Sequence, residues 1–235
     1  MALPKLNDSP KYKMTVPSTG QEVNFRPFLV KEEKVLMLAA ETEDQSHILS
    51  AITDTLSACI QEDIQTDKLT TFDVEYMFVI LRSKSVGETI DLKMKCENCE
   101  TENDYQIKIN DLAVVKPKQD STIVLDENIS IEMTWPTYKM VGANINDDVK
   151  ESDLVFNVLA GCIQTVMTEE EAFNLKDETQ EDIHAFIESM NSAQFEKVQK
   201  WIDAMPKLSH DIEFDCVKCD THNKTTVEGM QSFFT

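Results

Sequence analysis

The sequence is poor in glycine, in positive charge and in long hydrophobic runs, and each shortage argues against a class of protein. Only 5 of the 235 residues are glycine, and none lies in the glycine-rich spacing of a phosphate-binding loop. Basic residues number 22 against 43 acidic ones, for a net charge of −21, so phosphate backbones would be repelled and nucleic-acid binding is disfavoured. No run of 18 apolar residues occurs, which argues against a membrane-spanning helix.

The remaining composition is that of a globular protein in a reducing compartment. Hydrophobic residues make up 41% of the chain, which is ordinary globular usage. The N-terminal sequence MALPKLNDSPKYK lacks the apolar stretch of a signal peptide. We therefore expect the chain to stay in a reducing cytosol, where paired cysteines bind metal more often than they form disulfides.

Apolar periodicity and turn signals predict an α+β fold made of helices and short β-hairpins. In the first half they predict two strands within residues 11–28, helices at 31–44, 46–62 and 70–85, and a hairpin at 89–109. In the second half they predict a strand at 129–136, a helix at 153–167, an acidic loop or exposed connection at 168–182, helices at 181–190 and 193–205, and a hairpin at 210–228.

Two C-x-x-C pairs carry the only recognisable chemistry. Cys96 and Cys99 lie in the turn of the first predicted hairpin, and Cys216 and Cys219 lie in the turn of the second. Two such knuckles supply the four thiolates that a tetrahedral structural Zn²⁺ prefers. The sequence therefore predicts one zinc ion per chain, bound by sulfur alone.

The alternatives to this site are weaker. A thioredoxin-type redox pair should open a helix, whereas each pair here is followed by a polar, strand-like stretch. Disulfides would require an oxidising environment. His222 follows Cys219 closely and could replace a cysteine ligand, although a surface histidine is the simpler interpretation. Cys59 and Cys162 lie in apolar helical segments and are interpreted as core residues.

The two halves share landmarks that indicate an internal duplication. SACIQ at 57–61 matches AGCIQ at 160–164, and KCENC matches DCVKC. We therefore predict a first repeat at 1–116 and a second at 117–235, related by a pseudo-two-fold axis and forming one compact interleaved unit. Each repeat would contribute one knuckle to a zinc-ribbon-like site of four cysteines.

Several segments resemble one protein family. MALPKLN, PSTGQEVNFRPFLVKEEKVLMLA, TFDVEYMFVILRSKSVGE and NSAQFEKVQKWIDAMPKL are similar to the baseplate hub and hub-assembly proteins of T-even-type contractile-tailed phages, and the similarity extends from Met1 to the terminal GMQSFF. The resemblance implies a phage protein made in the host bacterial cytoplasm. It would act as a hub subunit or as a chaperone-like assembly factor, either within the virion tail or only during assembly.

The residues themselves favour a binding or assembly role over an enzyme. A site of four cysteine ligands leaves no open coordination position, and the sequence reveals no nucleophile relay or cofactor loop. We expect other baseplate hub proteins as partners, self-association as an additional option, and no nucleic acid, membrane or small-molecule substrate. The alternative is a zinc-ribbon nucleic-acid adaptor or transcription regulator. Phe233 and Phe234 near the C-terminus are expected either to dock on the protein's own core or to anchor a partner.

Overall fold

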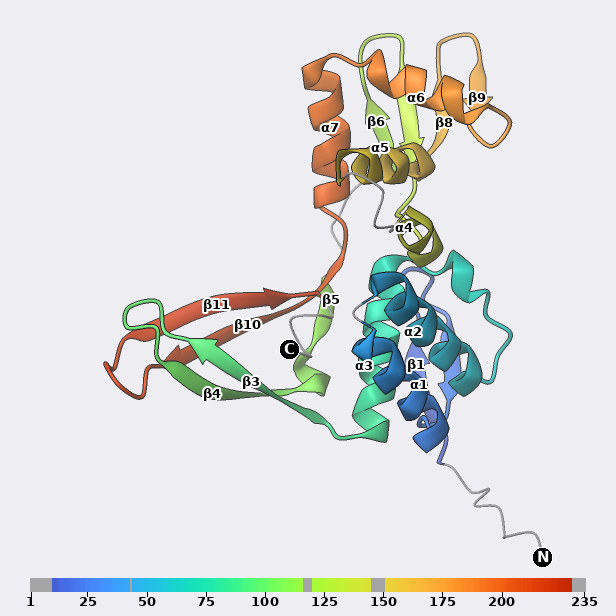
Figure 1. Ribbon diagram of the computed structural model, residues 1–235. Helices are drawn as coiled ribbons and strands as arrows, with labels where there is room; N and C mark the ends of the chain where they lie inside the picture. The colour runs from blue at the N-terminus through green and yellow to red at the C-terminus, as the bar shows by residue number, and fades with distance from the viewer. Residues whose placement is uncertain (1–9, 43, 116–119, 145–150, 230–235) are drawn as a thin grey trace, which may run out of the picture. The chain divides into compact units, whose positions relative to one another are not determined.

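The computed structural model describes residues 10–42, 44–115, 120–144 and 151–229, and the chain divides into two compact units (Figure 1). Unit 1 contains Met1–Val115 together with Lys207–Thr235, and unit 2 contains Lys116–Pro206. This division differs from the predicted repeats at 1–116 and 117–235, because the second cysteine hairpin belongs to unit 1. The structural reason is strand pairing: Lys207–Ser209 of that hairpin pair with Ala113–Val115.

The first part of unit 1 is a β-hairpin packed with three helices. Its elements are β1 (Tyr12–Thr15), β2 (Glu22–Phe25), α1 (Val30–Glu41), α2 (Gln45–Cys59), the 3-10 turn η1 (Thr66–Lys68) and α3 (Thr71–Ser85). The two predicted strands and three predicted helices are confirmed. Asp44 caps α2 by accepting from the backbone N–H groups of Ser46 and His47, as residues with short acceptor side chains do at helix N-termini.

Asp73 joins this hairpin to the start of α3. Its side chain is fully buried. One carboxylate oxygen accepts from the backbone N–H of Thr70 at 3.0 Å and from the Thr70 hydroxyl at 2.6 Å. The Thr70 hydroxyl oxygen in turn accepts from the Asp73 backbone N–H at 3.3 Å, which completes a capping box. The other carboxylate oxygen accepts from the backbone N–H of Ser18 at 2.7 Å. A single carboxylate therefore fixes both the β1–β2 turn and the helix end.

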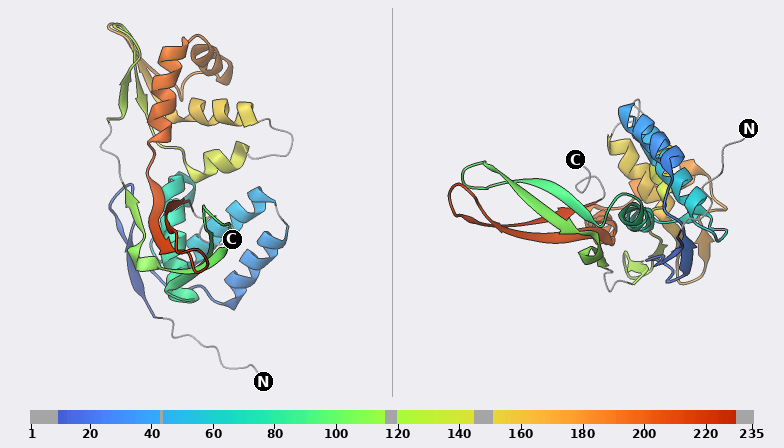
Figure 2. Two further views of the ribbon diagram at one scale, coloured as in Figure 1. Left: turned by 90° about the vertical axis from the view of Figure 1, so that its left-hand side faces the viewer. Right: turned by 90° about the horizontal axis from the view of Figure 1, so that it is seen from below.

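The second part of unit 1 consists of two long hairpins that lie side by side (Figures 1 and 2). One is β3 (Thr89–Lys95) with β4 (Glu102–Lys108), and the other is β10 (Lys207–Asp215) with β11 (His222–Glu228). After the turn η2 (Ile109–Asp111), β5 (Ala113–Val115) adds to β10 and makes a three-stranded sheet. Alternate side chains of both hairpins form one apolar cluster that contains Ile90, Leu92, Ile107, Leu208 and Ile212. The cysteine turns lie at the ends of the hairpins, beyond this cluster.

Unit 2 is an antiparallel four-stranded sheet with helices. Its elements are β6 (Thr122–Val124), β7 (Ser130–Met133), α4 (Tyr138–Asn144), α5 (Glu151–Cys162), β8 (Ile163–Met167), β9 (Ala172–Asn174), α6 (Gln180–Glu188) and α7 (Ser192–Asp203). The strands follow the order β6-β7-β8-β9. Trp135 and Trp201 stack with ring centroids 3.9 Å apart, and the Trp201 indole N–H donates to the Asp120 carbonyl at 2.8 Å. Trp201 is buried in the core of unit 2, and the partly buried Trp135 packs against that core.

One prediction for unit 2 is wrong at a boundary, and another segment has more regular structure than expected. The helix predicted at 153–167 ends at Cys162, and Ile163–Met167 form strand β8. The β-branched residues Ile163, Thr165 and Val166 favour a strand, and β7 offers them a pairing partner. The segment 168–182, predicted as a loop or exposed connection, is largely exposed but contains β9 and the start of α6.

The α+β class is confirmed, and the duplication stays a prediction. In its favour, Cys59 ends α2 and Cys162 ends α5, and the isoleucine after each enters β pairing: Ile60 bridges Phe25, and Ile163 pairs with Met133. Phe233 and Phe234 lie outside the described residues. None of the helices built from described residues has both the length and the hydrophobicity that crossing a membrane requires.

Candidate metal centre

Each hairpin presents its two cysteines from the same tight turn. Cys96 follows β3, where its backbone N–H donates to the Thr101 carbonyl at 3.0 Å and its carbonyl accepts from the Glu100 N–H at 2.9 Å. Cys216 follows β10 and makes the same pair of bonds with Thr221 and Asp220, each at 3.0 Å. These bonds close the turn, so both sulfurs of a pair point to the same side, as in a zinc knuckle.

The turns require a left-handed backbone at one residue each. Glu100 has φ 56° and Asp220 has φ 54°, and they are the only described residues other than glycine with positive φ. This conformation costs an L-residue roughly 1–2 kcal/mol. The surrounding hydrogen bonds and the cysteine cluster must therefore hold both turns in place.

The four cysteines that the sequence singled out converge at one point. The Sγ atoms of Cys96, Cys99, Cys216 and Cys219 all lie within 4.8 Å of one another. Two of these distances cross between the hairpins: 3.7 Å from Cys96 to Cys219 and 3.6 Å from Cys99 to Cys216. All four thiols are free, with Cys96 and Cys216 buried. The cluster could hold a metal ion.

Two buried asparagines connect the turns reciprocally. The Asn103 side-chain oxygen accepts from the Val217 N–H of the other hairpin, and the Asn223 oxygen accepts from the Glu97 N–H, each at 2.9 Å. Each amide nitrogen donates to the threonine carbonyl of its own turn, at 2.8 Å to Thr101 and 2.7 Å to Thr221. Such bonds orient the ligands of a metal site.

Sequence reasoning missed both asparagines, although a signal was present. The two turns read CENCETEN and CVKCDTHN, which share the pattern Cys-x-x-Cys-acid-Thr-x-Asn. The shared threonine and asparagine occupy the same positions after each pair, and their side chains contact the site. The pattern therefore extends four residues past the second cysteine of each knuckle.

Local hydrogen bonds favour the thiolate form at the second pair. Thr221, through its hydroxyl and its backbone N–H, lowers the pKa of the Cys219 thiol to about 6. The backbone N–H of Lys218, with its nitrogen 3.4 Å from the sulfur, lowers the pKa of Cys216. Metals bind thiolates rather than thiols, so the lowered pKa values of Cys216 and Cys219 suit these two side chains to metal binding.

The remaining cysteines and His222 lie apart from the cluster. Burial raises the pKa of Cys59 to about 11 and that of Cys162 to about 12, and both side chains are buried in the core. Their prediction as core residues is confirmed. The His222 ring nitrogen Nδ1 lies 2.9 Å from an Asp215 carboxylate oxygen, and this histidine does not belong to the cysteine group.

The comparisons with known proteins give one family. Comparison with curated proteins and with solved structures found no match. The family model described as T4 bacteriophage base plate protein matches residues 9–235, which is nearly the whole sequence. The chain therefore belongs to the T4 bacteriophage base plate protein family.

Proposed function

We propose that the four cysteines hold one structural Zn²⁺ ion that fastens the two hairpins of unit 1 together. The sulfur distances carry this proposal. Four sulfurs placed tetrahedrally at the usual Zn–S distance of about 2.3 Å lie about 3.8 Å from one another. The two distances between hairpins are 3.6 and 3.7 Å here, and all four sulfurs lie within 4.8 Å of one another. With four thiolate ligands such a site has no open position for substrate or water, so its role is structural.

At the level of the whole protein, we propose a non-enzymatic component of the phage baseplate that acts through contacts with other baseplate proteins. Membership of the baseplate family supports this role. The more specific part, a hub subunit or a chaperone-like hub-assembly factor, is supported by the resemblance of segments such as RPFLVKEEK. The protein would be made in the host bacterial cytoplasm and act on or in the tail.

The charge of the hairpins speaks against the alternative of a nucleic-acid adaptor. Lys93 pairs with Asp104, Lys224 with Glu213 at 2.7 Å, and Lys207 with Glu228 at 3.3 Å. Lysines that are already paired contribute little to phosphate binding, which depends on unneutralised positive charge. Filter binding with DNA and RNA at low salt should show no retention, and salt-dependent retention would favour the adaptor instead.

Metal analysis of matched cysteine variants tests the zinc site. Protein purified under reducing conditions without chelator should contain one zinc ion per chain. Cys99→Ser or Cys216→Ser should lose the metal and several kcal/mol of stability, because binding of structural zinc is coupled to folding. Cys59→Ala and Cys162→Ala remove buried sulfurs that lie outside the cluster and should keep the metal. Metal-free wild-type protein, or zinc retained in both serine variants, would contradict the assignment.

Co-purification tests the assembly role. The tagged full chain should be isolated in complex with other baseplate proteins when it is produced together with them. Mass spectrometry of mature particles then distinguishes a hub subunit, which remains in the tail, from an assembly factor, which does not. A chain that joins no baseplate protein under these conditions would contradict the proposed role.

A further inference from the structure

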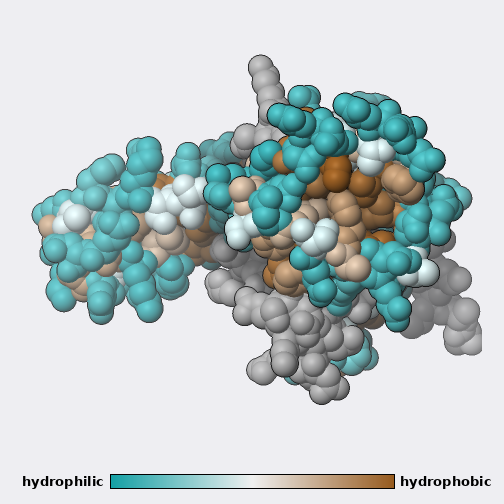
Figure 3. Space-filling view, turned by 90° about the horizontal axis from the view of Figure 1, so that it is seen from above, coloured by the Kyte–Doolittle hydropathy of each residue, from teal (hydrophilic) through white to brown (hydrophobic). Residues whose placement is uncertain are grey.

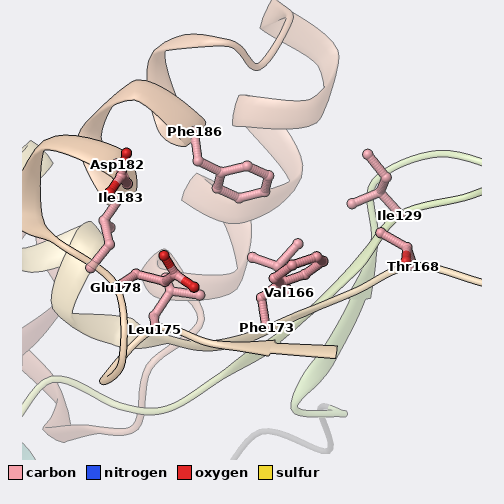
Figure 4. Close-up of a pocket in the computed structure, with 9 residues that line it drawn as sticks. All are labelled: Ile129, Val166, Thr168, Phe173, Leu175, Glu178, Asp182, Ile183 and Phe186. Carbon is pink, nitrogen blue, oxygen red and sulfur yellow. The ribbon is translucent and has the colours of Figure 1, made fainter. Parts of the chain in front are cut away.

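Unit 2 contains an apolar pocket between the end of its sheet and helix α6. The pocket has a volume of about 360 Å³. Val166, Phe173 and Leu175 line it from the sheet side, and Ile183 and Phe186 line it from α6. Figure 4 shows the Phe173 and Phe186 rings on opposite sides of the space, and Figure 3 shows hydrophobic surface surrounded by hydrophilic residues on unit 2. Phe173 is 41% exposed, which is unusual for a phenylalanine in a sheet.

The pocket lies beside a strand edge with unpaired peptide groups. β9 is the last strand of the sheet. The Leu175 N–H donates to the Gln164 carbonyl, and the Thr168 N–H donates to the Glu171 carbonyl. Because hydrogen-bonded and non-hydrogen-bonded pairs alternate along antiparallel strands, the peptide groups of Ala172 and Asn174 point away from β8. The Asn174 carbonyl accepts from Asp177. Among the described residues, nothing pairs with the outward N–H and C=O of Ala172 or with the N–H of Asn174.

The opposite edge of the same sheet is partly covered by a lysine. On β6, the Lys197 ammonium from α7 donates to the carbonyls of Val124 and Leu125 at 2.8 and 3.0 Å. Proteins usually protect edge strands in such ways, because an open edge pairs with other strands. The β9 edge has no such cover among the described residues, and an exposed aromatic ring lies next to it.

The negative charge around the pocket favours a positively charged partner segment. Figure 4 shows the carboxylates of Glu178 and Asp182 at one end of the pocket. The segment 168–182 has a single base, Lys176, against the acids Glu169, Glu170, Glu171, Asp177, Glu178, Glu181 and Asp182. The hydroxyl of Thr179, the N-cap residue of α6, donates to the Asp182 carboxylate at 2.5 Å. The Asp182 carboxylate is therefore already engaged at the helix start. Glu178 is exposed, which leaves its negative charge available to a ligand.

We propose that β9 and this pocket bind an extended segment of another baseplate protein, with an apolar side chain in the pocket and a lysine or arginine beside Glu178. The segment would add to β9 as a further strand, in the manner of β-augmentation, in which main-chain bonds give affinity and side-chain pockets give specificity. The proposal rests on the proposed protein–protein role and is independent of the metal centre.

Site-specific photo-crosslinking tests the surface in the full chain. A photoreactive phenylalanine analogue replaces Phe173. As a control it replaces Val124, which is exposed on the β6 edge beside Lys197. Each protein is produced together with the other baseplate proteins of the same phage. Position 173 should crosslink to an apolar segment flanked by lysine or arginine, and position 124 should not. Crosslinks from 173 to an acidic segment, to this chain's own residues 1–9 or to a second copy would overturn the proposal. A yield at 173 no higher than at 124 would also overturn it.

Matched variants separate the contributions of charge and edge. Glu178→Lys should reduce the yield at 173 about tenfold, the effect of roughly 1.4 kcal/mol, whereas Glu181→Lys makes the same charge change outside the pocket lining and should not. Ala172→Pro removes an outward N–H without removing a bond to β8, as is tolerated on edge strands, and should abolish the crosslink. Equal effects of the two lysine variants would contradict the proposed contact between Glu178 and a basic residue of the partner. If the complexes form while these changes have no effect, the inference fails and the proposed function stands.

Discussion

At the scale of single residues, Asn103 and Asn223 link the two cysteine turns by reciprocal hydrogen bonds. Each is almost fully buried and uses its amide in both directions, accepting from the opposite turn and donating to its own. The Asn103 amide nitrogen also lies 3.9 Å from the Cys216 sulfur. The sulfur positions therefore depend on side chains that bind no metal themselves.

We predict that Asn103→Ala weakens both the fold and the metal site. The substitution leaves the Val217 backbone N–H without its partner, which costs about 1–3 kcal/mol, and removes one of the two donors to the Thr101 carbonyl. Loss of such an outer bond typically lowers metal affinity about 10- to 100-fold. Zinc competition with a chromogenic chelator and thermal unfolding measure the two effects. Asn223→Ala should behave alike, and Asn98→Ala, which truncates an exposed asparagine of the same turn, should have a smaller effect. Wild-type zinc affinity in both buried-site variants would contradict this interpretation.

At the scale of elements, the RPFLVKEEK segment joins a strand to two helices. Arg26 follows β2, and its guanidinium donates to the Glu32 carboxylate in α1 at 2.8 Å and to the Ala58 carbonyl in α2 at 3.0 Å. The Glu32 carboxylate also accepts from the Leu29 N–H at the start of α1, at 2.8 Å. Burial by itself would raise the pKa of Glu32, but bonds from Arg26, Leu29 and Lys31 lower it to about 2.

We predict that Glu32 stabilises the protein in a pH-dependent way. Because its folded-state pKa is about 2 and an unfolded glutamate titrates near about 4.3, its contribution is full above the unfolded value and is lost as pH falls towards 2. Glu32→Gln should therefore cost about 2–3 kcal/mol at pH 7. The difference from wild type should shrink between pH of about 5 and 3, as urea unfolding can measure. Glu33→Gln, at an exposed neighbour, should show no such convergence, and a Glu32→Gln cost that is constant with pH would contradict the prediction.

The limits of sequence reasoning are clearest where a helix gives way to a strand. The hairpins, α1 to α3 and the four cysteines were predictable because alternation, capping residues and the C-x-x-C spacing are local signals. The change from α5 to β8 at Cys162 was not, since the apolar run LAGCIQTVM fits either period and pairing with the distant β7 decides the outcome. In the same way, the pairing of β5 with β10 places the second hairpin in unit 1. No local sequence pattern predicts this long-range pairing.

At the scale of the whole molecule, the two units hold different parts of the chemistry. All four clustered cysteines lie in unit 1, although two of them come from a segment that follows unit 2 in the sequence. Unit 2 has an apolar cluster of its own, with Ile131, Cys162, Val198 and Trp201 among its buried members. A metal in unit 1 should therefore stabilise the hairpins directly, while the fold of unit 2 depends on its own core.

The chain provides a spectroscopic test of this division. Its only two tryptophans, Trp135 and Trp201, stack in unit 2, so tryptophan emission reports that unit alone. We predict that removing the metal with a chelator under reducing conditions, or by Cys99→Ser, reduces the β-strand signal in far-UV circular dichroism and leaves the tryptophan emission maximum unchanged. Trp201→Phe removes the indole bond to Asp120. This variant should shift the tryptophan emission maximum, leave the strand signal of the hairpins unchanged and retain zinc. If the emission maximum shifts to longer wavelength together with the loss of strand signal, the core of unit 2 depends on the hairpins of unit 1, and the two units unfold as one.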